Sequence, residues 1–240
     1  MSLVKNIDQI EYPESDGKPM GETDLHRDWM VRILEIMRYR YRGQRVYIAS
    51  DLLVYYEEGE PKKFVVPDDF VVRDCDPGRR RTFKIWEEGK SPEVVFEVTS
   101  RSSRRKDQSW KSQVYFQIGV LEYFLYDPTS DYLDPPLRGY RRGARGFEMI
   151  TPTTAGVIEC QTLGIHLTLD DGQLVMHDAQ TGAILLTHGE AVEPDRAVAD
   201  AALRVADAAR FAAEQRTEEL EAEIRRLQDE LARKPRDSPN

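Results

Sequence analysis

The stretch SPEVVFEVTS, residues 91–100, contains one residue that does not match its neighbours. Its apolar, largely β-branched members form a run typical of a buried strand: Val94, Val95, Phe96 and Val98. Glu97 lies inside this run, and an ionised carboxylate is costly to bury unless a partner compensates its charge. Glu97 therefore either pairs with a buried cation for structural reasons or binds a metal and takes part in chemistry.

The composition limits the class of protein. The chain has 240 residues, of which 40% are hydrophobic and 32% charged, as expected for one large domain or one domain with an appendage. Residues 1–10 lack the features of a signal peptide, and no apolar run is long enough to cross a membrane. The two cysteines form no metal-type pair, so we expect a cytoplasmic protein. A formal charge of −9 argues against a protein that coats DNA regardless of sequence.

The segments on either side of this stretch alternate between helix and strand patterns. Apolar residues at helical spacing predict a helix from Leu25 to about Arg42, with Thr23 or Asp24 as its N-cap. Two strand patterns, in residues 45–59 and 62–74, predict an antiparallel pair. A second helix is expected after Ser100, ending at Gly119. We then expect a buried strand at 121–128 and short β-like pieces at 139–150, 164–169, 172–178 and 182–187.

This order predicts an α/β (α+β) domain over residues 1–188, with a mixed sheet flanked by helices and a β-rich extension. Residues 189–234 are rich in Ala, Glu and Arg and predict a C-terminal helical arm. Its last part has an a/d seam of Leu220, Ile224, Leu227 and Leu231. We expect this arm to form a coiled coil and a homo-oligomer, the alternative being a solvated single helix. Residues 235–240 are expected to be disordered.

A second carboxylate accompanies Glu97. Pro67 precedes Asp68 at the start of a predicted strand, while Asp69 is expected to point to the opposite face. Two carboxylates on adjacent strands could share a hard cation such as Mg²⁺. Such a metal can activate water and stabilise the charge that develops on a phosphate oxygen.

The ordered motifs of residues 11–188 resemble the PD-(D/E)XK nuclease superfamily, and within it the bacterial Uma-type family of proposed restriction endonucleases. The motifs that carry the resemblance are DGKPMGETDLHRDWM, LLVYYEEG, PDDFVV, RRRTFKIWEEG, EVVFEVTSRSSRRKD, GVLEYFLYDP and PPLRGYR. The resemblance implies a restriction-endonuclease-like fold and DNA as the substrate. It also implies that Asp68, Glu97 and the Val98 carbonyl bind Mg²⁺ or Mn²⁺.

One position departs from the superfamily pattern. The superfamily's lysine would lie two residues after Glu97, where this chain has Thr99. Lys111 and Lys106 in the next helix are the candidate replacements. Lys111 is preferred because an Asp-x-x-x-Lys-x-x-x-Tyr spacing recurs in the Uma-type pattern and places Asp107, Lys111 and Tyr115 on one helix face. The alternative for Lys111 is a surface pair with Asp107.

Further residues have weaker claims to the site. Glu22 matches a place where some superfamily nucleases add a carboxylate, although it could also serve as a helix-start residue. His26 could lie near the site or support packing, and Thr99 could bond water or phosphate. Residues expected to bind nucleic acid are Arg79, Arg80, Arg81, Arg101, Arg104, Arg105 and Lys106.

The sequence thus favours a metal-dependent endonuclease that hydrolyses DNA phosphodiester bonds. The alternative is a catalytically degenerate nuclease-fold protein that acts as a nucleic-acid-binding or assembly module. The substitution of Thr99 for lysine and the acidic net charge favour the alternative, whereas the intact acid pair opposes it. A hydrolase of another phosphate ester is a third interpretation.

Overall fold

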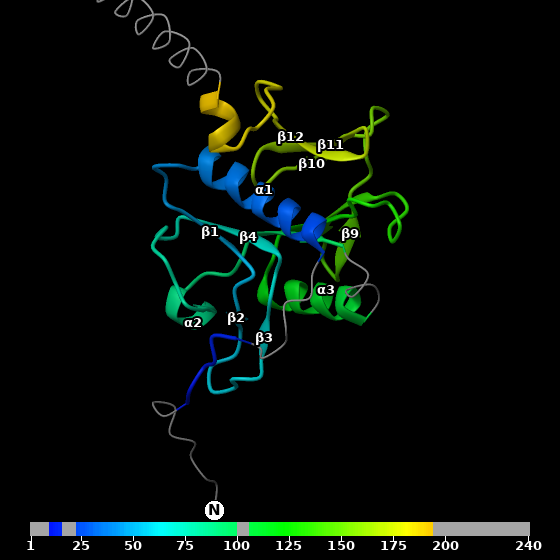
Figure 1. Cartoon of the computed structure of the whole chain (residues 1–240). Coiled ribbons are helices and arrows are strands. Elements are labelled where there is room, and N and C mark those ends of the chain that lie inside the picture. Colours follow the sequence, from blue (N-terminus) through cyan, green and yellow to red (C-terminus); the bar gives the residue numbers. More distant parts are fainter. Residues whose placement is uncertain (1–9, 16–22, 100–105, 194–240) are drawn as a thin grey trace, which may run out of the picture. The chain divides into compact units, whose positions relative to one another are not determined.

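The computed structural model describes residues 10–15, 23–99 and 106–193, although for residues 106–108 it defines only the backbone (Figure 1). The chain divides into two units, Met1–His188 and Gly189–Asn240. The seam of the predicted C-terminal arm and the tail at 235–240 lie outside the described residues. No helix among the described residues has the length and apolar character needed to span a membrane.

A six-stranded mixed sheet forms the centre of the fold, with the strand order β1-β4-β6-β7-β8-β9. Its strands are β1 (Val46–Ser50), β4 (Asp69–Arg73), β6 (Val94–Val98), β7 (Glu122–Tyr126), β8 (Leu137–Arg142) and β9 (Phe147–Met149). Strands β6 and β7 are parallel, while all other neighbouring pairs are antiparallel. A parallel pair needs a crossover connection, which here contains α3 (Lys106–Ile118). The predicted mixed sheet is confirmed.

Two three-stranded sheets, two further helices and a helical segment at residues 188–193 complete the described structure. One small sheet contains β10 (Ile158–Cys160), β11 (Ile165–Asp170) and β12 (Gln173–Asp178). The other contains β2 (Val54–Tyr55), β3 (Phe64–Val65) and β5 (Phe83–Lys84). The helices are α1 (Asp24–Arg40) and the short α2 (Ile85–Glu88).

Helix α1 begins where its sequence predicts. The Thr23 hydroxyl accepts a hydrogen bond of 3.2 Å from the His26 amide, which satisfies one free donor of the first turn. The buried side chains of α1 recur at helical spacing: His26, Trp29, Ile33, Ile36 and Met37. This face packs into one of the two hydrophobic cores.

The central sheet separates those two cores (Figure 1). Helix α1 and β10–β12 contribute to the core on one face, and α3, β2, β3 and β5 to the core on the other. Side chains alternate along β6, so that Phe96 and Val98 enter the first core while Val95 enters the second. Glu97 shares the face of Val95 and therefore points towards α3.

Two details differ from the sequence-based expectations. The segments 45–59 and 62–74 do pair antiparallel, but as β1 with β4 and β2 with β3, in two different sheets. The chain turns between β1 and β2 at Asp51, which has a φ of 50°. The β-like piece expected at 182–187 forms only an isolated antiparallel bridge, between His177 and Ile184, and no strand.

Strand β7 carries a buried glutamate of its own. Glu122 is 1% exposed and accepts hydrogen bonds from the amides of Thr162 (2.8 Å) and Gln161 (3.2 Å) and from Nε of Arg141 (2.8 Å). Burial would raise the pKa of Glu122, but the hydrogen bonds from Thr162 and Arg141 lower it below the usual value. Glu122 therefore joins β7 to the start of the loop after β10 as an ionised structural group.

We predict that Glu122→Gln lowers the free energy of unfolding by about 1.5–3 kcal/mol at neutral pH, because a charged acceptor is lost while its donors stay buried. A group whose pKa is lowered by folding stabilises the protein above its unfolded pKa, and this stabilisation disappears as the pH falls through its folded pKa. The difference in the free energy of unfolding between Glu122→Gln and the parent should therefore become smaller below about pH 4. Urea denaturation across this range measures it, and a difference that does not change with pH would contradict the assignment.

Candidate active site

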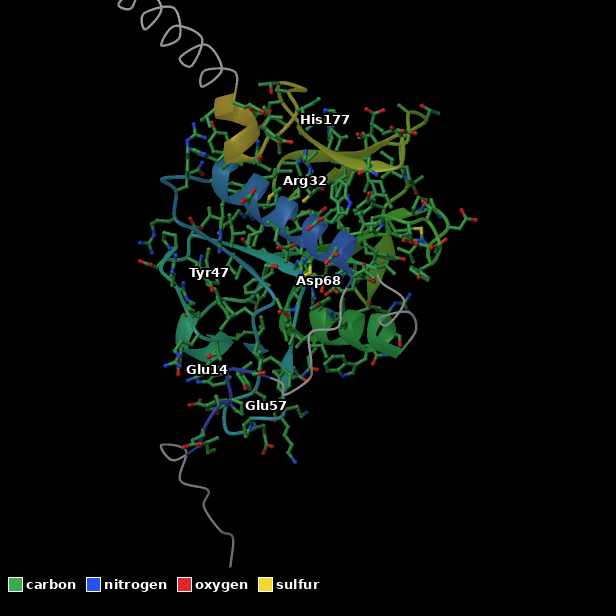
Figure 2. All side chains as sticks on the ribbon, in the orientation of Figure 1. Glu14, Arg32, Tyr47, Glu57, Asp68 and His177 are labelled. Carbon is green, nitrogen blue, oxygen red and sulfur yellow. The ribbon has the colours of Figure 1, made fainter. Side chains whose placement is uncertain are left out.

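The two predicted acids meet at one end of the central sheet. Strand β4 pairs with β6 so that Asp69 lies opposite Phe96, and one more residue in this register sets Asp68 opposite Glu97. The Asp68 carbonyl accepts hydrogen bonds from the Ser50 hydroxyl (2.7 Å) and the Asp51 amide (3.1 Å). These bonds hold the backbone of Asp68, which Figure 2 shows near the start of α1.

Helix α3 supplies two hydrogen-bond donors to Glu97. Nζ of Lys111 lies 2.7 Å from Oε2, and the Tyr115 hydroxyl donates to Oε1. Lys111 and Tyr115 are four residues apart and therefore project from the same helix face. The Lys111 side chain is 18% exposed and that of Glu97 is 10% exposed, so the pair lies just beneath the surface.

His26 connects the first turn of α1 to both acid-bearing segments. Its Nε2 donates to the Val98 carbonyl at 2.7 Å and lies 3.2 Å from Oδ2 of Asp68. Because a carbonyl can only accept, Nε2 must carry a proton. The Val98 amide donates to the same Asp68 oxygen at 2.8 Å. Asp68 is thereby oriented through Oδ2.

The electrostatics of Glu97 differ from those of Glu122. Burial raises the pKa of Glu97 to about 7, with Lys111 acting to lower it and Asp68 to raise it further. Burial and the nearby Glu97 raise the pKa of Tyr115 well above its usual value, so its hydroxyl stays protonated as a donor. Glu97 is thus held near its titration point, whereas Glu122 is ionised. A pKa shifted by burial and by a like charge is typical of functional sites.

Asp69 does not join this group. Its side chain is 1% exposed, and it belongs to the opposite sheet face from Asp68 because successive strand residues alternate. Burial and the neighbouring Asp68 raise the pKa of Asp69 well above its usual value. Asp69 therefore lies apart from Glu97, and Asp68 is the acidic residue that faces it across β4 and β6.

The donor set suits a hard divalent cation. Mg²⁺ is commonly bound by one or two carboxylates and completes its shell with water and phosphate oxygens. Among the residues with a described placement, no cluster of three or more His, Cys, Asp or Glu side chains is arranged to hold a metal. Asp68 and Glu97 provide two carboxylates. Burial raises the pKa of Glu97 most and repulsion by Asp68 raises it further, and a cation bound between them would offset both effects.

Comparison with known proteins identifies the family. Residues 5–170 match the Uma2 family, described as "Putative restriction endonuclease". The chain belongs to the Uma2 family. A crystal structure of a putative nuclease from Anabaena variabilis, assigned to DUF820, is similar with 14% identity and a TM-score of 0.45, covering 62% of this chain and 80% of that one. The sequence has no significant match among curated proteins.

Of the other residues predicted for the Uma2 site, several fall outside the described part of the chain: Glu22, Arg101, Arg104, Arg105 and the side chain of Lys106. Thr99 is 4% exposed, and its hydroxyl has no hydrogen-bond partner among the described residues. Arg80 is engaged by Glu88 at 2.5 Å, and Arg81 by Glu14 at 2.5 Å. Arg79 is exposed.

Sequence reasoning did not assign Tyr115 or Ser50 to the site. Tyr115 could have been found, because its spacing of four from Lys111 was already part of the family-like pattern. Ser50 had no such signal: its contact with Asp68 depends on the pairing of β1 with β4.

We predict that Glu97→Gln gains stability relative to the parent as the pH rises from about 4 to about 7 in EDTA. An acid whose pKa is raised by folding binds more protons in the native state, so the parent loses stability across this interval. Glutamine cannot ionise and does not contribute this loss. Thermal denaturation at several pH values measures the difference.

The same measurement with Mg²⁺ added above pH 7 tests the cation. The parent's melting temperature should rise because the ligand binds only the folded state, and that of Glu97→Gln should not. A stability difference that is independent of pH, together with equal responses to Mg²⁺, would show that Glu97 is a purely structural group.

Proposed function

We propose that this Uma2 protein is a metal-dependent endonuclease that hydrolyses DNA phosphodiester bonds on a restriction-endonuclease-like core. The observation that carries the proposal is the meeting of Asp68 and Glu97 at one sheet end, with the pKa of Glu97 near 7 and Lys111 2.7 Å from its carboxylate. Family membership supports the same chemistry. The Lys111–Glu97 pair lies just beneath the surface, so a phosphate could approach it from solvent.

The residues that would hold Mg²⁺ or Mn²⁺ are Asp68, Glu97 and Val98. A carbonyl oxygen has two lone pairs, so Val98 can accept from His26 and still offer one lone pair. When bound, the metal would activate a water molecule and stabilise the charge developing on a phosphate oxygen. Oδ1 of Asp68 receives no hydrogen bond from a described residue and would be the oxygen offered.

The chain's own side chains would divide the remaining work. Lys111 would position the attacking water and offset the phosphate charge, taking the role of the superfamily lysine from α3 rather than from β6. Tyr115 would hold Oε1 of Glu97 and leave its other oxygen to Lys111 and the metal. His26 would orient Asp68.

A second candidate function has its own support. Glu97 is already paired with Lys111 and Tyr115, Val98 with His26, and Thr99 replaces the superfamily lysine. Such an internally satisfied site fits a catalytically degenerate protein that binds nucleic acid or acts in assembly. Cleavage assays separate the two candidates.

We predict that Asp68→Asn and Glu97→Gln each abolish the nicking of supercoiled plasmid in Mg²⁺ or Mn²⁺, because each keeps the side-chain shape but removes the charge that holds the cation. Gel electrophoresis of the plasmid measures the loss, and Glu122→Gln, assayed below its melting temperature, is the matched control because it removes a buried glutamate outside the site. Nicking by both site variants at the parental rate would disprove the metal site.

Changes at Lys111 and Lys106 should have different effects, one on the cleavage rate and the other on DNA binding. Lys111→Ala should reduce the cleavage rate by about 10²-fold or more, as expected for the loss of a group that positions water or stabilises charge. Lys106→Ala should mainly weaken DNA binding in a salt-dependent manner. The opposite pattern would transfer the catalytic role to Lys106, and no effect of either change would favour the degenerate protein.

A further inference from the structure

A groove of about 710 Å³ runs beside β1, the edge strand of the central sheet. Five arginines line it: Arg38 and Arg42 from α1 and the turn after it, Arg45 before β1, and Arg79 and Arg80 from the loop after β4. No carboxylate occurs among the described residues that line the groove. In a chain with a net charge of −9, this is a strong local segregation of positive charge. We call it the arginine groove.

The floor of the arginine groove is the unpaired edge of β1. The Asp51 amide donates to the Asp68 carbonyl, so odd-numbered residues of β1 direct their backbone groups towards β4. The even-numbered residues, Val46, Ile48 and Ser50, therefore direct theirs into the groove. Nη2 of Arg38 lies 3.4 Å from the Ile48 carbonyl, as this alternation requires. The groove thus offers amides as well as guanidinium groups.

The arginines differ in what they can offer to a ligand. Arg80 is held by two hydrogen bonds to Glu88, at 2.5 and 2.8 Å, and lies over the Tyr47 ring at 4.1 Å, so it shapes the wall. Arg38, Arg42, Arg45 and Arg79 are exposed. Arg42 lies over the Tyr39 ring at 4.2 Å, which orients its guanidinium group. Four exposed guanidinium groups therefore line the arginine groove.

One residue of the arginine groove contacts the candidate active site. Ser50 lines the groove, and its hydroxyl donates to the backbone carbonyl of Asp68 at 2.7 Å. Figure 2 labels Tyr47 on the β1 side and Asp68 near the start of α1. A strand of five residues such as β1 is about 17 Å long, the axial rise of about five base pairs.

We propose that the arginine groove binds the sugar–phosphate backbone of one DNA strand on its way to the Asp68–Glu97 site. This inference rests on the proposed nuclease function and adds a location for the substrate outside the acid pair. Guanidinium groups and backbone amides are the donors that recognise phosphate oxygens without reading sequence. The segment that supplies three of the five groove arginines, RYRYRGQR at residues 38–45, has the interleaved basic and aromatic composition of such a surface.

Charge also argues against a second copy of the chain as the occupant. If two β1 edges paired, two sets of arginines would face each other, and like charges in contact are destabilising. An acidic polypeptide added as a strand would match the charge of the groove, but it would not explain why Ser50, which lines the groove, also holds the backbone of Asp68. That occupant is an outcome of the test below.

The test uses the full chain carrying Glu97→Gln, so that DNA binding is measured without cleavage. Arg42→Gln with Arg45→Gln should weaken the binding of a fluorescent duplex about tenfold or more at low salt, and should reduce the slope of log affinity against log salt by about 2. Lys62→Gln with Lys63→Gln is the matched control, since it removes two exposed charges outside the groove. The control should bind like its parent.

Arg42→Lys with Arg45→Lys should retain most of the affinity, and equal melting temperatures would exclude misfolding. The proposal for the groove would be overturned if the arginine pair and the lysine control bound DNA equally well. It would also be overturned if the Glu97→Gln parent and both glutamine pairs failed to bind DNA. Poly-glutamate serves as the probe for an acidic polypeptide. If Arg42→Gln with Arg45→Gln lost binding to poly-glutamate but not to DNA, the occupant would be an acidic polypeptide and the DNA proposal would be overturned. If DNA binding depended on these arginines but the unaltered chain did not nick plasmid, the DNA-binding groove would be supported and the proposed nuclease function would be refuted.

Discussion

The burial of the Glu97 carboxylate inside an apolar strand is the constraint on which the rest of the site depends. A charge in that position requires donors from another element, and α3 provides Lys111 and Tyr115. Helix α3 lies in the crossover that the parallel pairing of β6 with β7 requires. The same connection that allows this strand pairing therefore also carries the donors for the buried carboxylate.

Two buried glutamates on neighbouring strands show how environment decides a role. Glu122 receives hydrogen bonds from two backbone amides and a guanidinium group, and these lower its pKa despite burial. Burial, with Asp68 nearby, raises the pKa of Glu97 to about 7 although an ammonium group and a phenol act to lower it. The first arrangement stabilises one ionised state. The second leaves the charge of Glu97 responsive to a cation, which is the property that a metal-dependent site needs.

Charge is distributed unevenly over this acidic chain. Four exposed arginines and one internally paired arginine line the groove at the β1 edge, and the hydroxyl of Ser50, the last residue of β1, donates to the backbone carbonyl of Asp68. In the proposed nuclease, this division would let a polyanion approach along one edge while the net charge of −9 opposes binding elsewhere. Affinity and catalysis would then reside in separate residues of one continuous surface.

The sequence by itself determined the helix of α1 with a cap at Thr23 or Asp24, the buried strand around Glu97 and the family, because these depend on local periodicity and ordered motifs. It also marked Asp68, Glu97, His26 and Lys111 as candidates. Only the tertiary structure brought His26 to Asp68 and Lys111 to Glu97 within hydrogen-bond distance. It also added Tyr115 and Ser50 and gathered arginines from residues 38–45 and 79–80 around one edge. Strand pairing and helix placement join residues far apart in sequence, and no local pattern encodes that pairing.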